Sequence, residues 1–250
     1  MRHPNRVLGS HPDPYTTYSN QRFPLGQVME LPDGRIYRFA EVGAAALAAS
    51  KLCTGMAMTA NFDTLAVQTA TVVGDTTIKF TNGTTSLVEN ELAEGTILQE
   101  DVALSLGSIY PIKSSTAGGS AATITATLAD GVTVQEAVST SGKVTVRVNP
   151  WKQVIIQGSP PLQLVTGIPQ VVIGLTQYGW LQTHGVTNCL IDGSVLVIGQ
   201  GVRPSELVDG AVTFLDFTEA TQADLGLIGF AIVGDNTSDT MFEPIFLRLD

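Results

Sequence analysis

The second half of this chain, and much of the first, alternates apolar and polar residues in short runs. Gly, Asn or Asp interrupts these runs roughly every 8–12 residues. Clear examples are ATITATLA (122–129), KVTVRV (143–148) and AVTFLDF (211–217). A period of two places every second side chain on the same face of a strand, so each run can bury one face and expose the other. The pattern predicts a mainly β protein built from sandwich or barrel modules.

Three local patterns refine this expectation. Residues 23–42 contain Pro-Asp-Gly between two apolar runs, which predicts a β-hairpin because Pro presets φ and Gly accepts a positive φ. Asn82-Gly83 predicts a second hairpin between the flanking runs IKF and TTSLV. The Ala-rich segment 43–60 predicts one short helix, with β-structure or a loop as the alternative.

Residues 1–22 are polar and contain three prolines, so we expect an extended N-terminal arm and no signal peptide. Residues 1–51 carry six basic residues against four acidic ones, whereas the rest of the chain is strongly acidic. Either this small excess has no meaning, or the arm docks onto an acidic partner. In the second case the contact residues would be Arg2, Arg6, Tyr15, Tyr18 and Arg22.

Pro-rich sequence near 149–161 suggests a seam between modules. The predicted division is an arm at 1–22, a β-rich module with the hairpin and the short helix at 23–150, and a β-barrel or sandwich at 151–250.

Composition argues against several kinds of partner. The net charge is −10 and only 14% of residues are charged, so a basic nucleic-acid-binding face is not expected. No run approaches 18 uninterrupted apolar residues, so no membrane span is expected. Cys53 and Cys189 are far apart and belong to no CxxC motif, which argues against zinc. We expect two buried free thiols in a protein made in a reducing cytosol, with one disulfide as the alternative.

The sequence offers little catalytic chemistry. His184 is the single histidine outside the arm, and its neighbours Cys189 and Asp192 form no known signature with it. Motifs for zinc hydrolysis, phosphate binding and serine nucleophiles are absent from the sequence. We therefore predict no catalytic residue, no cofactor, no metal ligand and no enzymatic activity.

The segment TQYGWLQTHGV (176–186) gathers aromatic and polar residues between glycines. Strict alternation places Tyr178, Trp180 and Gln182 on one face, with an irregularity expected at Gly179 and His184 at an exit turn. We interpret the segment as two short strands or one bulged strand at a packing centre. Trp151, Tyr178 and Trp180 are the predicted core or interface anchors, and the indole N–H of Trp180 is expected to need an acceptor.

Several segments together resemble virion structural proteins of tailed bacteriophages. They are PLGQVMELPDGRIYRFAEVGAAALAASKL, NPWKQVIIQG, QYGWLQTHGV, VIGQGV, GAV, GLIGFAIVG and PIFLRL. The likeness covers most of residues 22–250 as a loose pattern and includes no catalytic motif.

This resemblance implies a capsid decoration, or cement, protein. Such a protein would bind the major capsid protein on the capsid exterior, as a homotrimer, after synthesis in the host bacterial cytoplasm. The alternatives are another virion component, such as a head fibre base, tail or baseplate protein, and a carbohydrate-binding adhesion module. A sugar-binding module would use exposed aromatic residues, for which Trp151 and Trp180 are the candidates.

Overall fold

The structure is a computed structural model, and it describes residues 6–56, 62–100, 107–161, 163–216, 226–234 and 240–250. Within these ranges nearly all regular structure is β, which confirms the predicted mainly β class. The one helical element described is a single 3₁₀ turn, η1 (Asp13–Tyr15).

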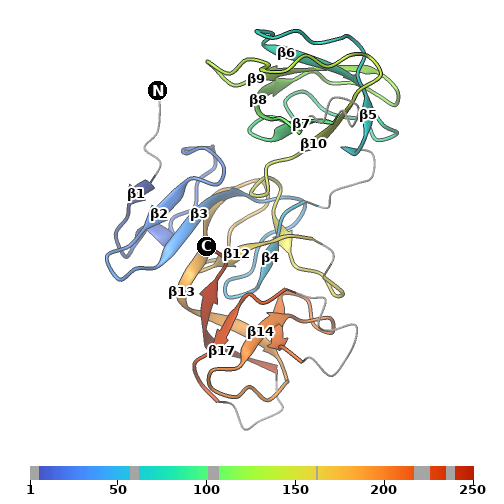
Figure 1. Cartoon of the computed structure of the whole chain (residues 1–250). Coiled ribbons are helices and arrows are strands. Elements are labelled where there is room, and N and C mark those ends of the chain that lie inside the picture. The colour runs from blue at the N-terminus through green and yellow to red at the C-terminus, as the bar shows by residue number, and fades with distance from the viewer. Residues whose placement is uncertain (1–5, 57–61, 101–106, 162, 217–225, 235–239) are drawn as a thin grey trace. The chain divides into compact units, whose positions relative to one another are not determined.

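The chain forms two compact units, and the second is inserted into the first (Figure 1). Unit 1 comprises residues 1–57 and 150–250, and unit 2 comprises residues 58–149. The predicted seam near 150 coincides with one end of unit 2. The predicted module 23–150 is wrong, however, because residues 36–41 and 53–54 pair with strands of the C-terminal part of the chain.

Unit 1 contains an eleven-stranded sheet in which eight strands follow the order β1-β2-β3-β13-β15-β14-β16-β17. Of the other three, β12 pairs with β13 and β4, and β4 also pairs with β11. The first strands are β1 (Arg6–Leu8), β2 (Val28–Glu30), β3 (Ile36–Glu41) and β4 (Cys53–Thr54). After unit 2 follow β11 (Ile155–Ile156), β12 (Val165–Pro169), β13 (Tyr178–Asp192), β14 (Gly201–Pro204), β15 (Ala211–Phe214), β16 (Gly229–Ala231) and β17 (Thr240–Arg248).

Strand β13 is the centre of unit 1. Its first half pairs antiparallel with β3, and Leu181 and Gln182 also pair with β12 on the other edge. Its second half pairs antiparallel with β17 over nine residues and parallel with β15 at Leu190 and Ile191. Residues of β13 contribute to all three apolar clusters of the unit. This strand therefore connects the N-terminal and C-terminal parts of the sheet.

The predicted hairpin at 23–42 is confirmed. Strands β2 and β3 pair antiparallel, and the turn closes through a hydrogen bond from the Gly34 amide to the Leu31 carbonyl, 3.0 Å. Gly34 has a φ of 83°, the left-handed conformation that the Pro-Asp-Gly pattern predicted.

The Ala-rich segment does not form the predicted helix in its described part, residues 43–56. Leu47 is fully buried instead, and its main chain exchanges two hydrogen bonds with Ile173. The run of small alanines gives a helix little apolar surface to bury, so pairing with a distant segment prevails over intrinsic propensity. The rest of the predicted helix lies outside the described residues.

The N-terminal segment is not a free arm over its described part, residues 6–22. Strand β1 pairs parallel with β2, and Tyr18 exchanges two main-chain hydrogen bonds with Tyr178. The segment covers the edge of its own sheet, since an unpaired strand edge leaves main-chain groups without partners.

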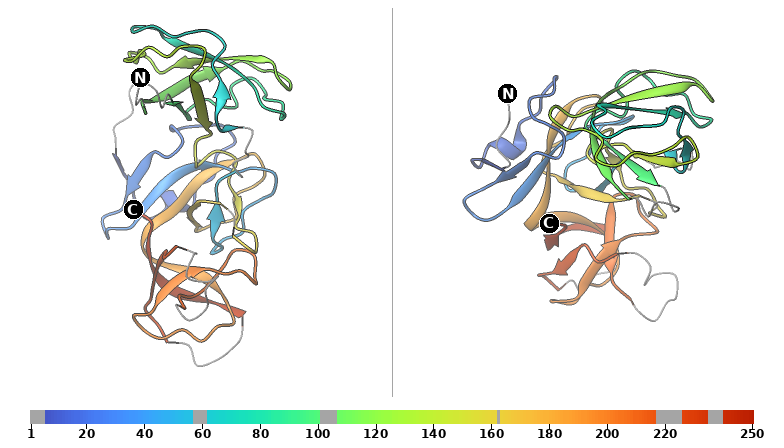
Figure 2. Two further views of the ribbon diagram at one scale, coloured as in Figure 1. Left: turned by 45° about the vertical axis from the view of Figure 1, so that its right-hand side comes forward. Right: turned by 45° about the horizontal axis from the view of Figure 1, so that its top comes forward.

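Unit 2 is a six-stranded sheet that curves back on itself (Figure 2). The order is β5-β10-β7-β8-β9-β6, and the Gln68 amide, just after β5, donates to the Lys79 carbonyl of β6, so the sheet closes. The strands are β5 (Leu65–Ala66), β6 (Thr77–Thr81), β7 (Thr96–Glu100), β8 (Ile109–Ser115), β9 (Thr123–Leu128) and β10 (Lys143–Arg147). Its interior holds buried side chains of alternating positions, including Ile78, Phe80, Ile97, Ile124, Val144 and Val146.

The hairpin predicted at Asn82-Gly83 is wrong. Strand β6 pairs with β9, some forty residues further along, and not with the segment that follows Gly83. Asn82 is buried, and its amide group donates to the carbonyls of Thr85 (2.7 Å) and Gly119 (3.0 Å). The Asn side chain thus organises a loop instead of a two-residue turn.

The chain leaves unit 1 before the insertion and returns to it afterwards at neighbouring positions. Strands β4 and β11, which flank the insertion, pair with each other, and the Cβ position of Gly55 lies 2.6 Å from the Pro150 carbonyl oxygen.

We predict that replacing residues 58–149 by a short Gly/Ser linker leaves unit 1 folded. Both tryptophans, Trp151 and Trp180, belong to unit 1, so fluorescence reports on this unit alone. A blue-shifted emission with cooperative thermal unfolding is expected, whereas solvent-like emission would show that unit 1 needs the insertion.

Candidate functional site

The predicted anchor residues form an aromatic cluster around Phe39 of β3. Its ring centroid lies 5.1 Å from that of Trp180, 5.9 Å from that of Tyr178 and 5.3 Å from that of Phe23. Trp180 is 2% exposed. The alternation explains the placement, because Trp180 faces this cluster while its neighbour Leu181 faces another buried cluster on the opposite side of β13. Trp180 and Leu181 are therefore packed inside the protein, as the predicted packing centre requires.

Two details of this segment differ from expectation. Strand β13 is a single strand that continues through His184 to Asp192, and its irregularity lies between Gln182 and His184 instead of at Gly179. Within the described part of the chain, no acceptor lies within hydrogen-bonding distance of the indole N–H of Trp180. The rings of Phe23 and Phe39 pack against the indole, with centroids 5.2 and 5.1 Å from its own.

Trp151 is half-buried between two apolar clusters. The guanidinium carbon of Arg38 lies 4.8 Å from the centre of its ring. Arg38 also donates to both carboxylate oxygens of Asp250. Partial burial disfavours the charged form of Asp250, but the hydrogen bonds from Arg38 and Thr183 hold its pKa below the ordinary value. Trp151 thus contributes to the attachment of the C-terminal residue and is not an exposed ring.

Two of the residues predicted to contact a partner also make contacts within the chain. The Tyr18 ring lies 5.8 Å from that of Phe39 of the same chain, and Arg6 forms an ion pair with Glu30. Tyr15 is partly exposed beside His11, and Arg22 is exposed. Arg2 lies outside the described residues.

The structure does not unite the residues considered for catalysis. His184 and Asp192 are eight positions apart on one continuous strand, which corresponds to roughly 25 Å. Asp192 instead accepts hydrogen bonds from Ser194 and Ser205, 2.6 and 2.7 Å. The Cys189 thiol is fully buried. Among the described residues, no group of three or more His, Cys, Asp and Glu side chains could hold a metal ion, and no helix is long and apolar enough to cross a membrane.

An exposed aliphatic patch lies on the surface of unit 1. Two segments without any charged residue, 193–201 and 226–234, meet here through hydrogen bonds from the Gly199 amide to the Ala231 carbonyl and from the Ala231 amide to the Gln200 carbonyl. The Cβ position of Gly234 lies 3.6 Å from Ile198 Cγ1. The patch consists of Val197, Ile198, Ile232 and Val233, which are 62%, 69%, 38% and 42% exposed. A signal for it was present in the sequence as two charge-free segments, each bounded by glycines.

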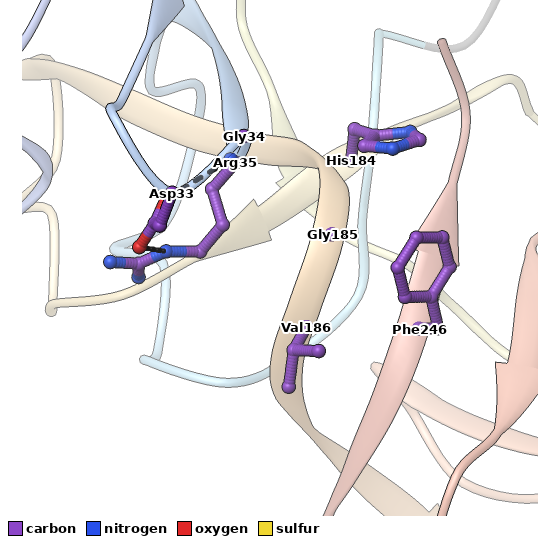
Figure 3. Close-up of a pocket in the computed structure, with 7 residues that line it drawn as sticks. All are labelled: Asp33, Gly34, Arg35, His184, Gly185, Val186 and Phe246. Carbon is purple, nitrogen blue, oxygen red and sulfur yellow. Dashed lines mark hydrogen bonds and ion pairs between the residues drawn. The ribbon is translucent and has the colours of Figure 1, made fainter.

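A separate hollow of about 560 Å³ lies over β13 at Gly185. Figure 3 shows Arg35 on one side of this strand and Phe246 on the other, with Gly185 between them. The hollow is also lined by Asp33, His184 and Val186. Gly185 has a φ of 92°, and a Cβ there would lie 3.0 Å from Arg35 Cγ, so a larger residue would be strained and crowded. We call this feature the Gly185 hollow. Sequence reasoning missed it, because it depends on the register shift in β13.

Comparison with models of protein families, with curated proteins and with solved structures found no match for this chain.

The position of Trp180 leads to a stability prediction. Trp180→Ala should lower the free energy of unfolding by about 3–5 kcal/mol, because it leaves a large cavity beside Phe39. Urea denaturation followed by far-UV circular dichroism would measure this. Phe242→Ala is the matched control, since Phe242 is exposed and its truncation should change stability by less than about 0.5 kcal/mol. Equal effects of the two substitutions would contradict the assignment of Trp180 to the core.

The two cysteines, expected as buried free thiols, are confirmed as such. Burial raises the pKa of Cys189 to about 12 and that of Cys53 still further. In the unfolded chain a thiol has a pKa of about 8.5. Above that pH the unfolded thiols ionise while the buried ones stay protonated, so the free energy of unfolding falls. The stability lost by a Cys53→Ala/Cys189→Ala double variant, measured by urea denaturation, should therefore be smaller at pH 10 than at pH 7. A pH-independent difference would contradict the raised pKa values.

Proposed function

We propose that this chain is a structural protein of a tailed-bacteriophage virion that binds the outer surface of the capsid and stabilises it. Its partner would be the major capsid protein, and its place the capsid exterior, where it would sit as a homotrimer. The sequence resemblance suggests this role, and the aliphatic patch is the structural observation that supports it best.

The patch has the chemistry of a protein-binding surface. Four branched aliphatic side chains lie together without a charged residue in either segment that carries them. Removing apolar surface from water contributes about 25 cal/mol for each Å², so a partner that covers the patch gains affinity without needing charge complementarity. On a capsid the same weak contact is repeated many times, and copies held together in an oligomer bind with avidity.

The scaffold behind the patch suits a structural role. Val202 of β14, Ala231 of β16 and Ile245 of β17 pack in one buried cluster with Leu196 and with Ile228, the residue before β16. Val197 and Ile198 directly follow that buried leucine in the sequence, so the exposed surface is attached to the core. A rigid surface loses little conformational entropy on binding.

The alternatives receive less support. A carbohydrate-binding module using Trp151 and Trp180 would need these rings at the surface, and Trp180 is buried while Trp151 is half-buried. A hydrolase using His184 would need a partner that orients it. The considered partner Asp192 is distant along β13 and is bonded to serines.

The proposal predicts binding to capsids that lack the protein. Purified wild-type protein should co-sediment with such capsids and raise their melting temperature, because a ligand that binds the assembled state stabilises it. The Ile198→Asp/Val233→Asp variant should bind at least about tenfold more weakly than the wild type, since it places two charges on the patch. Calorimetry and sedimentation of heads from the phage that encodes the chain provide both measurements.

Leu164→Asp is the matched control for this experiment. Leu164 is 68% exposed and lies outside the patch, so its variant should bind as the wild type does. If wild-type protein never bound the capsids, or occurred only in the tail fraction of disrupted virions, the decoration role would be wrong. If both aspartate variants bound equally well, the patch would not be the contact surface.

A further inference from the structure

The Gly185 hollow is a second surface feature, and its chemistry differs from that of the aliphatic patch. Its volume of about 560 Å³ falls within the range of roughly 300–1,000 Å³ that is usual for small-molecule sites. The hollow exists because Gly185 has no side chain at the point where β13 passes between the β2–β3 turn and β17 (Figure 3). A concave surface on paired strands is held in place by the sheet.

One side of the hollow presents a neutralised ion pair. Arg35 Nε donates to Asp33 Oδ2, 2.8 Å, and the Arg35 amide donates to Asp33 Oδ1, 3.1 Å. Partial burial disfavours the charged form of Asp33, but these bonds from Arg35 hold its pKa below the ordinary value. Arg35 Nη1 donates to the Tyr37 hydroxyl, 3.0 Å, and a guanidinium carries five N–H groups in all. The pair therefore offers both a carboxylate acceptor and further N–H donors.

The other side of the hollow is apolar and aromatic. Phe246 is half-buried and packs edge-to-face with His184, with 5.3 Å between the ring centroids. Val186, which pairs with Phe246 across the two strands, is 50% exposed. The Phe246 ring and the Val186 methyl groups give a surface on which C–H groups can pack.

The polar and apolar sides of the hollow together favour a neutral ligand with both hydrogen-bonding groups and an apolar face. The Asp33–Arg35 pair carries no net charge, so it gives neither an anion nor a cation a net electrostatic attraction. A wholly apolar ligand would remove a polar pair from water without replacing its hydrogen bonds. A ligand with alternating hydroxyl donors and acceptors and an apolar C–H face satisfies both sides. We propose that the Gly185 hollow binds a neutral saccharide.

A neighbouring hollow extends the site. It has a volume of about 300 Å³, shares Asp33 and Arg35 with the first, and is otherwise lined by Gly9, Ser10, His11, Leu31 and Pro32. The β2–β3 turn therefore stands between two adjoining spaces. A second sugar unit would fit there, with the hydroxyl of Ser10 and the ring of His11 as polar neighbours, so the ligand class includes short oligosaccharides.

The test uses the full-length protein and four probes, the methyl glycosides of glucose, galactose, mannose and N-acetylglucosamine. Saturation-transfer NMR and titration of backbone amide signals should show saturable binding of at least one probe at millimolar concentration. The shifted amides should include Gly185 and Val186. The proposal does not rest on capsid binding, so these measurements need no capsid.

Variants connect the binding to the site. Phe246→Leu and Asp33→Asn should each weaken binding on the order of tenfold. Phe242→Leu is the matched control on the same strand, because Phe242 is exposed outside the hollow, and its affinity should equal that of the wild type. If Phe246→Leu fails to fold, Asp33→Asn still tests the polar side, since an exposed turn residue tolerates this change.

Three results would overturn the proposal. One is the absence of saturable binding for all four glycosides. Another is binding that Phe246→Leu and Asp33→Asn leave unchanged. The third is a shift of the Gly185 and Val186 amides by inorganic phosphate and not by any glycoside, which would identify an anion site instead.

Discussion

Unit 1 depends on strand β13, whose two faces are both buried in its first half. In the first half of β13, Trp180 packs against the aromatic cluster and Leu181 against a second apolar cluster, while the strand edges pair with β3 and β12. In the second half, Cys189 and Ile191 face a third cluster and the edges pair with β17 and β15. A strand buried in this way has no alternative register, because a shift of one residue would exchange tryptophan and leucine between clusters of different shape.

The two candidate surfaces arise where this constraint relaxes. Between Gln182 and His184 the pairing of β13 with β3 shifts register, and Gly185, which follows, has no side chain, so a hollow forms between its neighbours. Beyond the end of β13, the chain turns through residues 193–201 and exposes aliphatic side chains next to β16. The buried clusters follow β13 along its length, whereas the two surface features are local.

Features that depend on residues close together in the sequence could be predicted, whereas features that depend on distant strand pairing could not. The hairpin at Leu31–Gly34 was predictable because its turn chemistry lies within four residues. The burial of Trp180 followed from alternation within β13. Asn82-Gly83 failed as a hairpin signal because the partner of β6 lies far away, in β9. The insertion of unit 2 and the Gly185 hollow could not be predicted, since both depend on which distant strands pair.

The insertion also gives the polypeptide an unusual connectivity. Residues 6–56 and 150–250 are held in one sheet by the pairing of β3 with β13 and of β4 with β11, independently of the covalent path through unit 2. A protease that cut the chain anywhere between residues 58 and 149 would produce two fragments that share a common hydrophobic interior and remain associated. The two segments of unit 1 are thus complementary pieces of one sheet, joined by strand pairing as well as by the chain.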